Sequence, residues 1–295
     1  MLPIAAVVQI DPLQIAPSAA FGVMYLLRAR TLAGQGRPVP SWRQCCWYGG
    51  LAIIAVTLVG LGSVSDELFL AHMAEHLLIA DIGALLLVLG LTGPLLAPLL
   101  RAPVLGWMRG LAHPVPAFTL WAADLLFWHL VGPHEAAVRH DVVHALQHML
   151  FVGLGLNMWM ALLGPLPKPA WFGNAAKLGY IIAVRLTTTV LANVFVWTGG
   201  AFFGVYAVGE RARGISPQSD QVVAGSIMMV EGSILTLCLF CWLFLRSARE
   251  GQERQELLEL AAAGGVALDE RRAARAVAAG RGAELRARIE QGPDG

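Results

Sequence analysis

Residues 69–92 read FLAHMAEHLLIADIGALLLVLGLT, and this stretch decides the fold class. A helix needs roughly 20 mostly apolar residues to cross a bilayer, and the only Asp, Glu, Lys or Arg side chains here are Glu75 and Asp81. The whole chain has the same character, because its 295 residues are 57% hydrophobic and 14% charged, with a mean hydropathy of +0.62. A soluble domain is about 45–50% apolar and about 25% charged. The composition therefore predicts an integral membrane protein and excludes an ordinary soluble enzyme.

Similar stretches recur along the chain, so we predict an all-α fold, a polytopic membrane helical bundle with about seven transmembrane helices in the lipid bilayer. The formal net charge of +1 offers no electrostatic basis for binding nucleic acid, and we expect no such partner. The predicted spans are residues 12–29, 45–64, 69–92, 116–132, 142–164, 178–198 and 221–245.

Basic residues set the orientation of this bundle through the positive-inside rule. The side reached after the first, third and fifth spans is rich in them, whereas the other side holds only Arg139, Arg211 and Arg213. We therefore expect the N-terminus outside and the C-terminus in the cytoplasm. No basic residue precedes the first apolar stretch, so we expect no cleaved signal peptide. The basic residues of the predicted inner side are Arg28, Arg30, Arg37, Arg43, Arg101, Arg109, Lys168 and Lys177.

The composition changes near residue 246. We predict a transmembrane domain over residues 1–246 and a charged cytoplasmic tail, rich in Ala, Arg and Glu, over residues 247–295. Short surface helices are expected in the tail, with breaks at Gly264-Gly265 and at Gly280.

The histidines gather at one predicted level, because only His113 of the eight falls on the inner side. His72 and His76 are four residues apart, and so are His144 and His148. Residues at this spacing lie one above the other on a helix face, and such a pair can offer two imidazole nitrogens to one metal ion. Two pairs on neighbouring helices would make a four-nitrogen site.

Other side chains extend this candidate site. His129 is expected one turn below the outer surface, and Asp220 begins the last span at the same level as Gln221. Imidazole ligands suit Zn, Cu, Fe and Ni, whereas thioethers favour Cu(I), and four methionines flank these positions: Met73, Met149, Met228 and Met229. We expect His134 and His140 to be ordinary loop residues. Glu75 either accepts a hydrogen bond from a ligand or faces outer solvent. The predicted metal ligands are His72, His76, His129, His144, His148 and Asp220.

Four charged residues fall inside the predicted spans, where each costs a few kcal/mol: Asp81, Asp124, Arg185 and Glu231. The simplest expectation is that Arg185 pairs with Asp124 or Glu231. The alternative is a polar path that leads inward from the histidines through Asp81.

These motifs, in this order, resemble the seven-span CtaG family of cytochrome c oxidase assembly factors, associated with caa-type oxidases. The resemblance covers residues from about 10 to 246, and Glu231 and the long charged tail depart from the family's pattern. It rests on Asp11-Pro12, Trp42-Arg43, residues 72–78 (HMAEHLL), Gly93-Pro94, Trp128-His129, residues 144–151 (HALQHMLF), Ser216-Pro217, Asp220-Gln221 and residues 224–229 (AGSIMM).

The resemblance implies a multi-pass protein of the bacterial plasma membrane that helps to assemble haem–copper oxidase, with subunits of that oxidase as partners. It implies a non-catalytic step in which copper is bound and delivered near the outer face. Carried over residue by residue, the family's motif histidines fall on His72, His76, His129, His144 and His148, and its acidic-Gln pair falls on Asp220 and Gln221.

Two other functions stay open from the residues alone. One is a membrane redox protein in which histidine pairs ligate haem or another metal, and the other is a metal transporter with a path through Asp81, Asp124 and Glu231. A zinc hydrolase is disfavoured, because HMAEH lacks the HExxH order in which Glu directly follows the first His.

Overall fold

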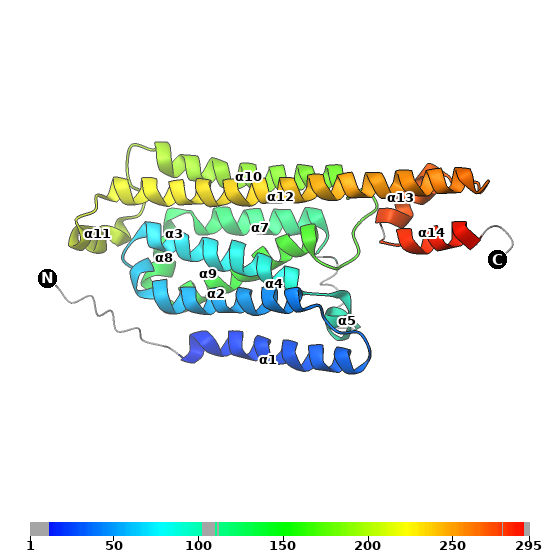
Figure 1. Ribbon diagram of the computed structural model, residues 1–295. Coiled ribbons are helices and arrows are strands. Elements are labelled where there is room, and N and C mark those ends of the chain that lie inside the picture. The colour runs from blue at the N-terminus through cyan, green and yellow to red at the C-terminus, as the bar shows by residue number, and fades with distance from the viewer. Residues whose placement is uncertain (1–11, 102–109, 111, 279, 292–295) are drawn as a thin grey trace. The chain divides into compact units, whose positions relative to one another are not determined.

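The computed structural model describes residues 12–101, 110, 112–278 and 280–291 (Figure 1). The regular elements in this part are all helical, which confirms the all-α prediction. They are α1 (Pro12–Gly34), α2 (Ser41–Ser65), α3 (Phe69–His76), the π-helix η1 (Leu77–Gly83), α4 (Ala84–Gly90), α5 (Gly93–Arg101), α7 (Pro114–Trp128), α8 (Val131–Arg139), α9 (Asp141–Leu163), α10 (Asn174–Trp197), the 3₁₀-helix η3 (Gly204–Tyr206), α11 (Ala207–Arg213), α12 (Pro217–Ala263), α13 (Glu270–Ala278) and α14 (Gly282–Gln291).

Five helical segments in the described part are long and apolar enough to cross a membrane. A sixth is present if α7 and α8, which are bent by 73° where they meet, form one span. α1 is helical where a first span is predicted, but it is not among the five. The count of seven spans and the orientation of the termini stay predictions. The five segments are α2, the continuous stretch Phe69–Gly90, α9, α10 and α12.

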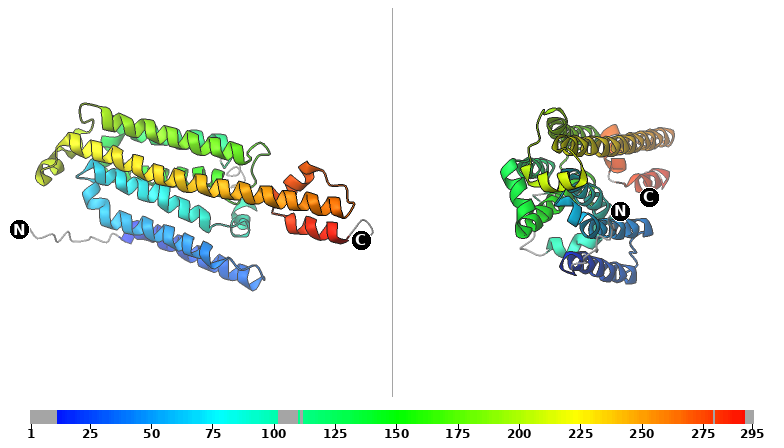
Figure 2. Two further views of the ribbon diagram at one scale, coloured as in Figure 1. Left: turned by 45° about the horizontal axis from the view of Figure 1, so that its top comes forward. Right: turned by 90° about the vertical axis from the view of Figure 1, so that its left-hand side faces the viewer.

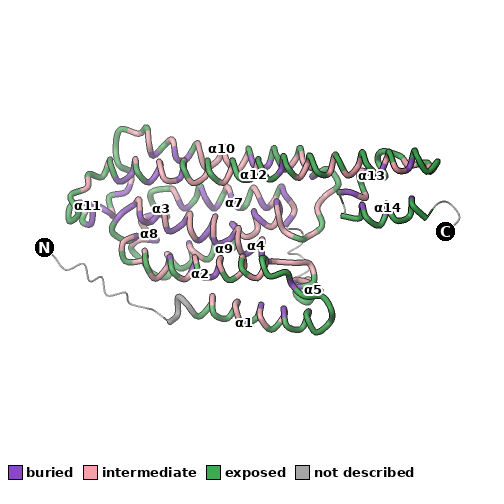
Figure 3. The backbone as a smooth tube through the Cα atoms, in the orientation of Figure 1, coloured by how far each residue is buried: buried purple, intermediate pink, exposed green. Residues whose placement is uncertain are grey.

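The chain divides into two compact units, Met1–Ile234 and Leu235–Gly295. The predicted domain boundary at residue 246 stays a prediction. In the first unit, α2 packs along α3, η1 and α4, and α9 packs against α7, η1 and α4. Figures 1 and 2 show these helices side by side as a bundle. Burial is concentrated on α3 and α7, whereas α1 is largely exposed (Figure 3).

The outward face of the bundle carries large apolar side chains. Val56 is 71% exposed and Trp197 is 80% exposed. A soluble protein rarely exposes apolar side chains in large contiguous patches. Together with the long apolar helices, this surface fits a protein whose solvent is lipid.

Two glycines bring the central helices close together. A Cβ atom at Gly155 of α9 would lie 2.5 Å from the backbone oxygen of Ala80 in η1, and one at Gly83 would lie 2.7 Å from Cγ1 of Ile54 in α2. Such distances are far inside van der Waals contact, so only glycine fits at these two positions. The contacts fix α9 and α2 against the segment that follows His76.

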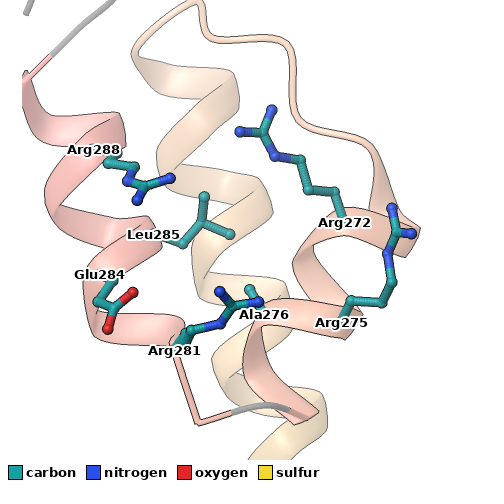
Figure 4. Close-up of a pocket in the computed structure, with 7 residues that line it drawn as sticks. All are labelled: Arg272, Arg275, Ala276, Arg281, Glu284, Leu285 and Arg288. Atoms are coloured by element: carbon teal, nitrogen blue, oxygen red, sulfur yellow. The ribbon is translucent and has the colours of Figure 1, made fainter. Parts of the chain in front are cut away.

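The second unit has its own small apolar core, formed by Leu257, Ala261, Val277, Leu285 and Ile289. Its breaks fall where the glycines predict them, since Gly265 and Gly280 adopt φ values of 66° and 68°, a left-handed conformation that glycine takes without strain. Between α13 and α14 lies a pocket of about 320 Å³, toward which Arg272 and Arg288 extend (Figure 4).

Candidate metal centre

The two predicted histidine pairs lie against each other. His72 and His76 are on α3, and His144 and His148 begin α9. The rings of His72 and His144 stack with centroids 5.1 Å apart and planes 9° apart, and the rings of His76 and His148 lie 5.4 Å apart. Within each pair the centroids are 4.3 Å apart. The sequence prediction that two i, i+4 pairs share one level on neighbouring helices therefore matches the geometry.

The order of these contacts shows that α3 and α9 run in the same direction. His72 faces His144, His76 faces His148, and further along Ala80 meets Gly155. The residue number rises together on both sides. The close approach at Gly155 thus holds the two histidine pairs in register from below.

The inner members of this cluster are buried without satisfaction. His72 is 0% exposed and His76 is 5% exposed. In the described part of the chain, no ring nitrogen of either residue meets a hydrogen-bond partner with good geometry, and Nε2 of both His144 and His148 is also unpaired. Buried polar groups in proteins are nearly always hydrogen-bonded, and an orphaned one costs about 1–3 kcal/mol. A metal ion is the partner that would use several of these lone pairs at once.

Donor atoms converge in two overlapping groups among the described residues. One donor atom each from His72, His76 and His144 lie within 4.8 Å of one another, and so do donor atoms from Glu75, His144 and His148. Glu75 is 1% exposed, and its Oε2 lies 3.8 Å from Nε2 of His148. Of the two alternatives that the sequence left open for Glu75, the structure therefore contradicts the solvent-facing one.

Asp66 lies at the rim of the cluster, in the turn between α2 and α3. Its Oδ1 is 3.8 Å from Nδ1 of His144. Burial raises the pKa of the Asp66 carboxyl, and the neighbouring His144 acts in the opposite direction. The cluster thus has one carboxylate beneath His148 and another at its edge, which adds negative charge around four neutral donors.

His134 is not the loop residue that the sequence predicts. It lies on α8, is 0% exposed, and its ring centroid is 4.7 Å from that of His72. Its Nε2 shares a hydrogen bond of 2.7 Å with the hydroxyl of Tyr206. Burial raises the pKa of Tyr206 well above its ordinary value, so the phenol stays protonated at this contact. The sequence missed this position because α8 is short and polar, and reads as a connection.

The structure places Asp220 at the beginning of α3. Its Oδ2 accepts a hydrogen bond from the backbone N–H of Phe69 (2.8 Å), and its Oδ1 accepts one from that of Leu70 (2.9 Å). A carboxylate there satisfies orphan N–H groups and favours the positive end of the helix dipole. The side chain thereby positions the helix turn that carries His72. Its part as a metal ligand stays a prediction.

His129 lies at the end of α7, where it caps the helix. Its Nε2 is 3.3 Å from the thioether sulfur of Met73, and it belongs to neither of the two donor groups. Its part in the four-histidine cluster also stays a prediction.

The expected pairing of Arg185 is wrong for the described residues. Its guanidinium donates to the Met229 carbonyl at 3.0 Å and to the Ser233 hydroxyl at 2.8 Å, and no ion pair within 4 Å joins it to Asp124 or Glu231. The reason is geometric, because α12 offers a free carbonyl and a hydroxyl on the side that faces α10.

Comparison with known proteins gives distant relatives. The chain is 26% identical over 193 residues to the uncharacterized protein Mb0105 of Mycobacterium bovis and to the uncharacterized protein MT0111 of Mycobacterium tuberculosis. It is 24% identical over the same length to the uncharacterized protein ML1998 of Mycobacterium leprae. Each match covers 59% of this chain and 29% of the relative, so the chain spans less than a third of these proteins' length. No solved structure matches.

The family comparison covers most of the chain. The model described as cytochrome c oxidase caa3 assembly factor (Caa3_CtaG) matches residues 23–250. This range includes both histidine pairs, Glu75, His129, His134 and Asp220. The match agrees with the resemblance carried by the sequence motifs. The chain therefore belongs to the cytochrome c oxidase caa3 assembly factor family.

Proposed function

We propose that this protein binds copper through His72, His76, His144 and His148 and delivers it to haem–copper oxidase during assembly. The observation that carries the proposal is the pair of buried histidines on α3, whose ring nitrogens lack partners and face a second pair across a parallel helix. Copper is the cargo here and undergoes no chemistry, so the role is not enzymatic. The family supplies the oxidase as the recipient.

The donor set supports this assignment. Imidazole is a good ligand for copper, and the carboxylate of Glu75 lies close enough to His148 to orient it or to share the ion. His144 and His148 keep 16% and 18% of their side-chain surface exposed, whereas His72 is sealed. An ion held between these two pairs is bound on one side by buried ligands and approached on the other through accessible ones. That asymmetry suits a site that must release its metal.

The proposal includes the place of delivery. With the predicted topology, the histidine level lies at the outer end of the bundle in the plasma membrane, next to where an oxidase subunit would receive copper. The partner surface is then the face around Asp66 and His144.

The test uses the full chain purified in detergent. Cu(I) is added without oxygen, and the bound metal is counted by competition with a coloured Cu(I) chelator, together with an absorption spectrum. We expect His72→Ala/His76→Ala and His144→Ala/His148→Ala each to lose the same histidine-bound copper. The matched control is His140→Ala, which removes an exposed histidine directly before α9.

Either of two results would overturn the proposal. Copper binding that survives both double variants would show that the four histidines are not the ligands. A Soret band in the purified protein would instead support the redox alternative. The cellular readout is the copper content of the oxidase in membranes of a host whose own copy is replaced by each variant, and metal uptake into vesicles would point to the transporter.

A further inference from the structure

His129 has a fixed tautomer, and this fixes the character of its second nitrogen. Its Nδ1 lies 2.6 Å from the backbone oxygen of Leu125. A carbonyl oxygen only accepts, so Nδ1 carries the proton and donates it. In the neutral ring, Nε2 is then a bare lone pair. Histidines that ligate metals are oriented in this way, with the other ring nitrogen donating to a carbonyl.

This lone pair faces a second one. The Sδ atom of Met73 lies 3.3 Å from Nε2 of His129, and a thioether sulfur has no proton to donate. Metal–nitrogen and metal–sulfur bonds are roughly 2.0 and 2.3 Å long, by the values that zinc makes. Two such donors at a tetrahedral angle on one ion lie about 3.5 Å apart. The observed separation is therefore close to that of two ligands of a single metal ion.

The two donors open into a small cavity of about 40 Å³. It is enough for an ion and a water molecule, since one water needs at least about 10–15 Å³ measured in this way. Met228 of α12 supplies a second thioether to the wall, and His76, which is 5% exposed with no partner for either nitrogen, also lines it. Of the four clustered histidines, His76 is the one that borders this cavity.

Two carboxylates complete the cavity wall, Asp81 of η1 and Glu231 of α12. In an ordinary α-helix, Asp81 would point well away from His76, five residues earlier. In the π-helix η1, residues five apart stack, so both side chains reach the same cavity. Oε1 of Glu231 is buried without a hydrogen-bond partner in the described part of the chain. Negative charge at this depth favours a bound cation.

We infer that the bundle contains a second, softer metal site for Cu(I), with Met73 and His129 as ligands, and that His76 links it to the four-histidine cluster. Thioether with imidazole is a donor pair that selects Cu(I). Movement between the two sites exchanges ligands and leaves the ion as Cu(I), so it needs no electron. The inference rests on the proposed function for its cargo, but its ligands other than His76 are separate.

The test is Cu(I) stoichiometry and copper X-ray absorption on the full chain, loaded without oxygen. We expect two Cu(I) per chain and a sulfur shell near about 2.3 Å. Met73→Leu should remove the sulfur shell and one copper. The matched control is Met149→Leu, a methionine beside His148 that is 69% exposed, and it should change neither. His144→Ala/His148→Ala should lose one copper and keep the sulfur shell.

A second measurement needs no substitution. Selenomethionine-labelled protein should show selenium in the copper shell, and Met73→Leu on that background should remove it. A sulfur shell that persists in Met73→Leu, or no sulfur or selenium scattering in the unsubstituted protein, would overturn the inner site. Binding that persists in the histidine double variants with its sulfur shell intact would overturn only the four-histidine proposal, so the two failures are distinguishable.

Discussion

The backbone oxygen of Ala80 and Gly155 are in direct contact, so close that a Cβ on residue 155 would lie 2.5 Å from that oxygen. We predict that Gly155→Ala pushes α9 away from η1. Overpacking of this kind costs about 1–3 kcal/mol. Since the contact lies below His76 and His148 on the same two helices, copper affinity should fall together with the thermal midpoint, measured in detergent.

The control for this change is two residues away. A Cβ atom at Gly153 would have no neighbouring atom within 4 Å, so Gly153→Ala adds the same methyl group to the same helix without a clash. It should match the unsubstituted protein in both readouts. An equal loss in the two variants would mean that helix propensity, and not the approach of η1, explains the effect.

Asp220→Ala should loosen the first turn of α3. The carboxylate holds the N–H groups of Phe69 and Leu70, and loss of a helix cap typically costs about 0.5–2 kcal/mol. Because His72 sits in that turn, we also expect weaker copper binding with unchanged stoichiometry. Asp141→Ala, which removes an exposed acid from the first turn of α9, is the comparison. Complete loss of one copper in Asp220→Ala alone would instead make Asp220 a ligand.

Tyr206→Phe removes the hydrogen bond to the fully buried His134. Leaving a buried polar group unsatisfied costs about 1–3 kcal/mol, so the thermal midpoint should drop. Tyr48→Phe removes a longer and more exposed hydrogen bond, of 3.3 Å to the Gly22 carbonyl, and should cost less. The expectation fails if the two substitutions lower the midpoint equally.

Glu75→Gln tests the carboxylate beneath His148. Loss of a partner that orients a metal ligand typically lowers affinity about 10–100-fold, and chelator competition measures that change. Glu67→Gln is the control, because Glu67 is exposed and pairs with Arg213 on the surface. An affinity that is the same in both variants would remove Glu75 from the site.

Much of the candidate site was visible in the sequence because it depends on local spacing. His72 with His76, and His144 with His148, are four residues apart on apolar helices, and helix geometry alone stacks each pair. That the pairs meet across two helices was expected from their common depth. The family was also identifiable from the ordered motifs, as the match over residues 23–250 confirms.

What the sequence did not predict depends on contacts between distant segments. Asp220 caps a helix that begins about 150 residues earlier in the chain, and no local pattern announces this. His134 is buried through α8, which is too short and polar to read as a packed helix. The shared cavity of His76 and Asp81 depends on a π-helix, and α-helical periodicity puts these residues on different faces.

The π-helical segment Leu77–Gly83 has one more consequence for the family's architecture, which concerns chain length. A π-helical turn accommodates about one residue more than an α-helical turn, so the segment behaves as a one-residue insertion. Deleting one residue there would restore an α-helix with its backbone hydrogen bonds intact, and would rotate everything after it by about 100°. His72 and His76 would keep their places, whereas Asp81 and Gly83 would leave theirs. The number of residues in this segment, more than their apolar identity, keeps the histidines and the cavity beneath them on one side of the helix.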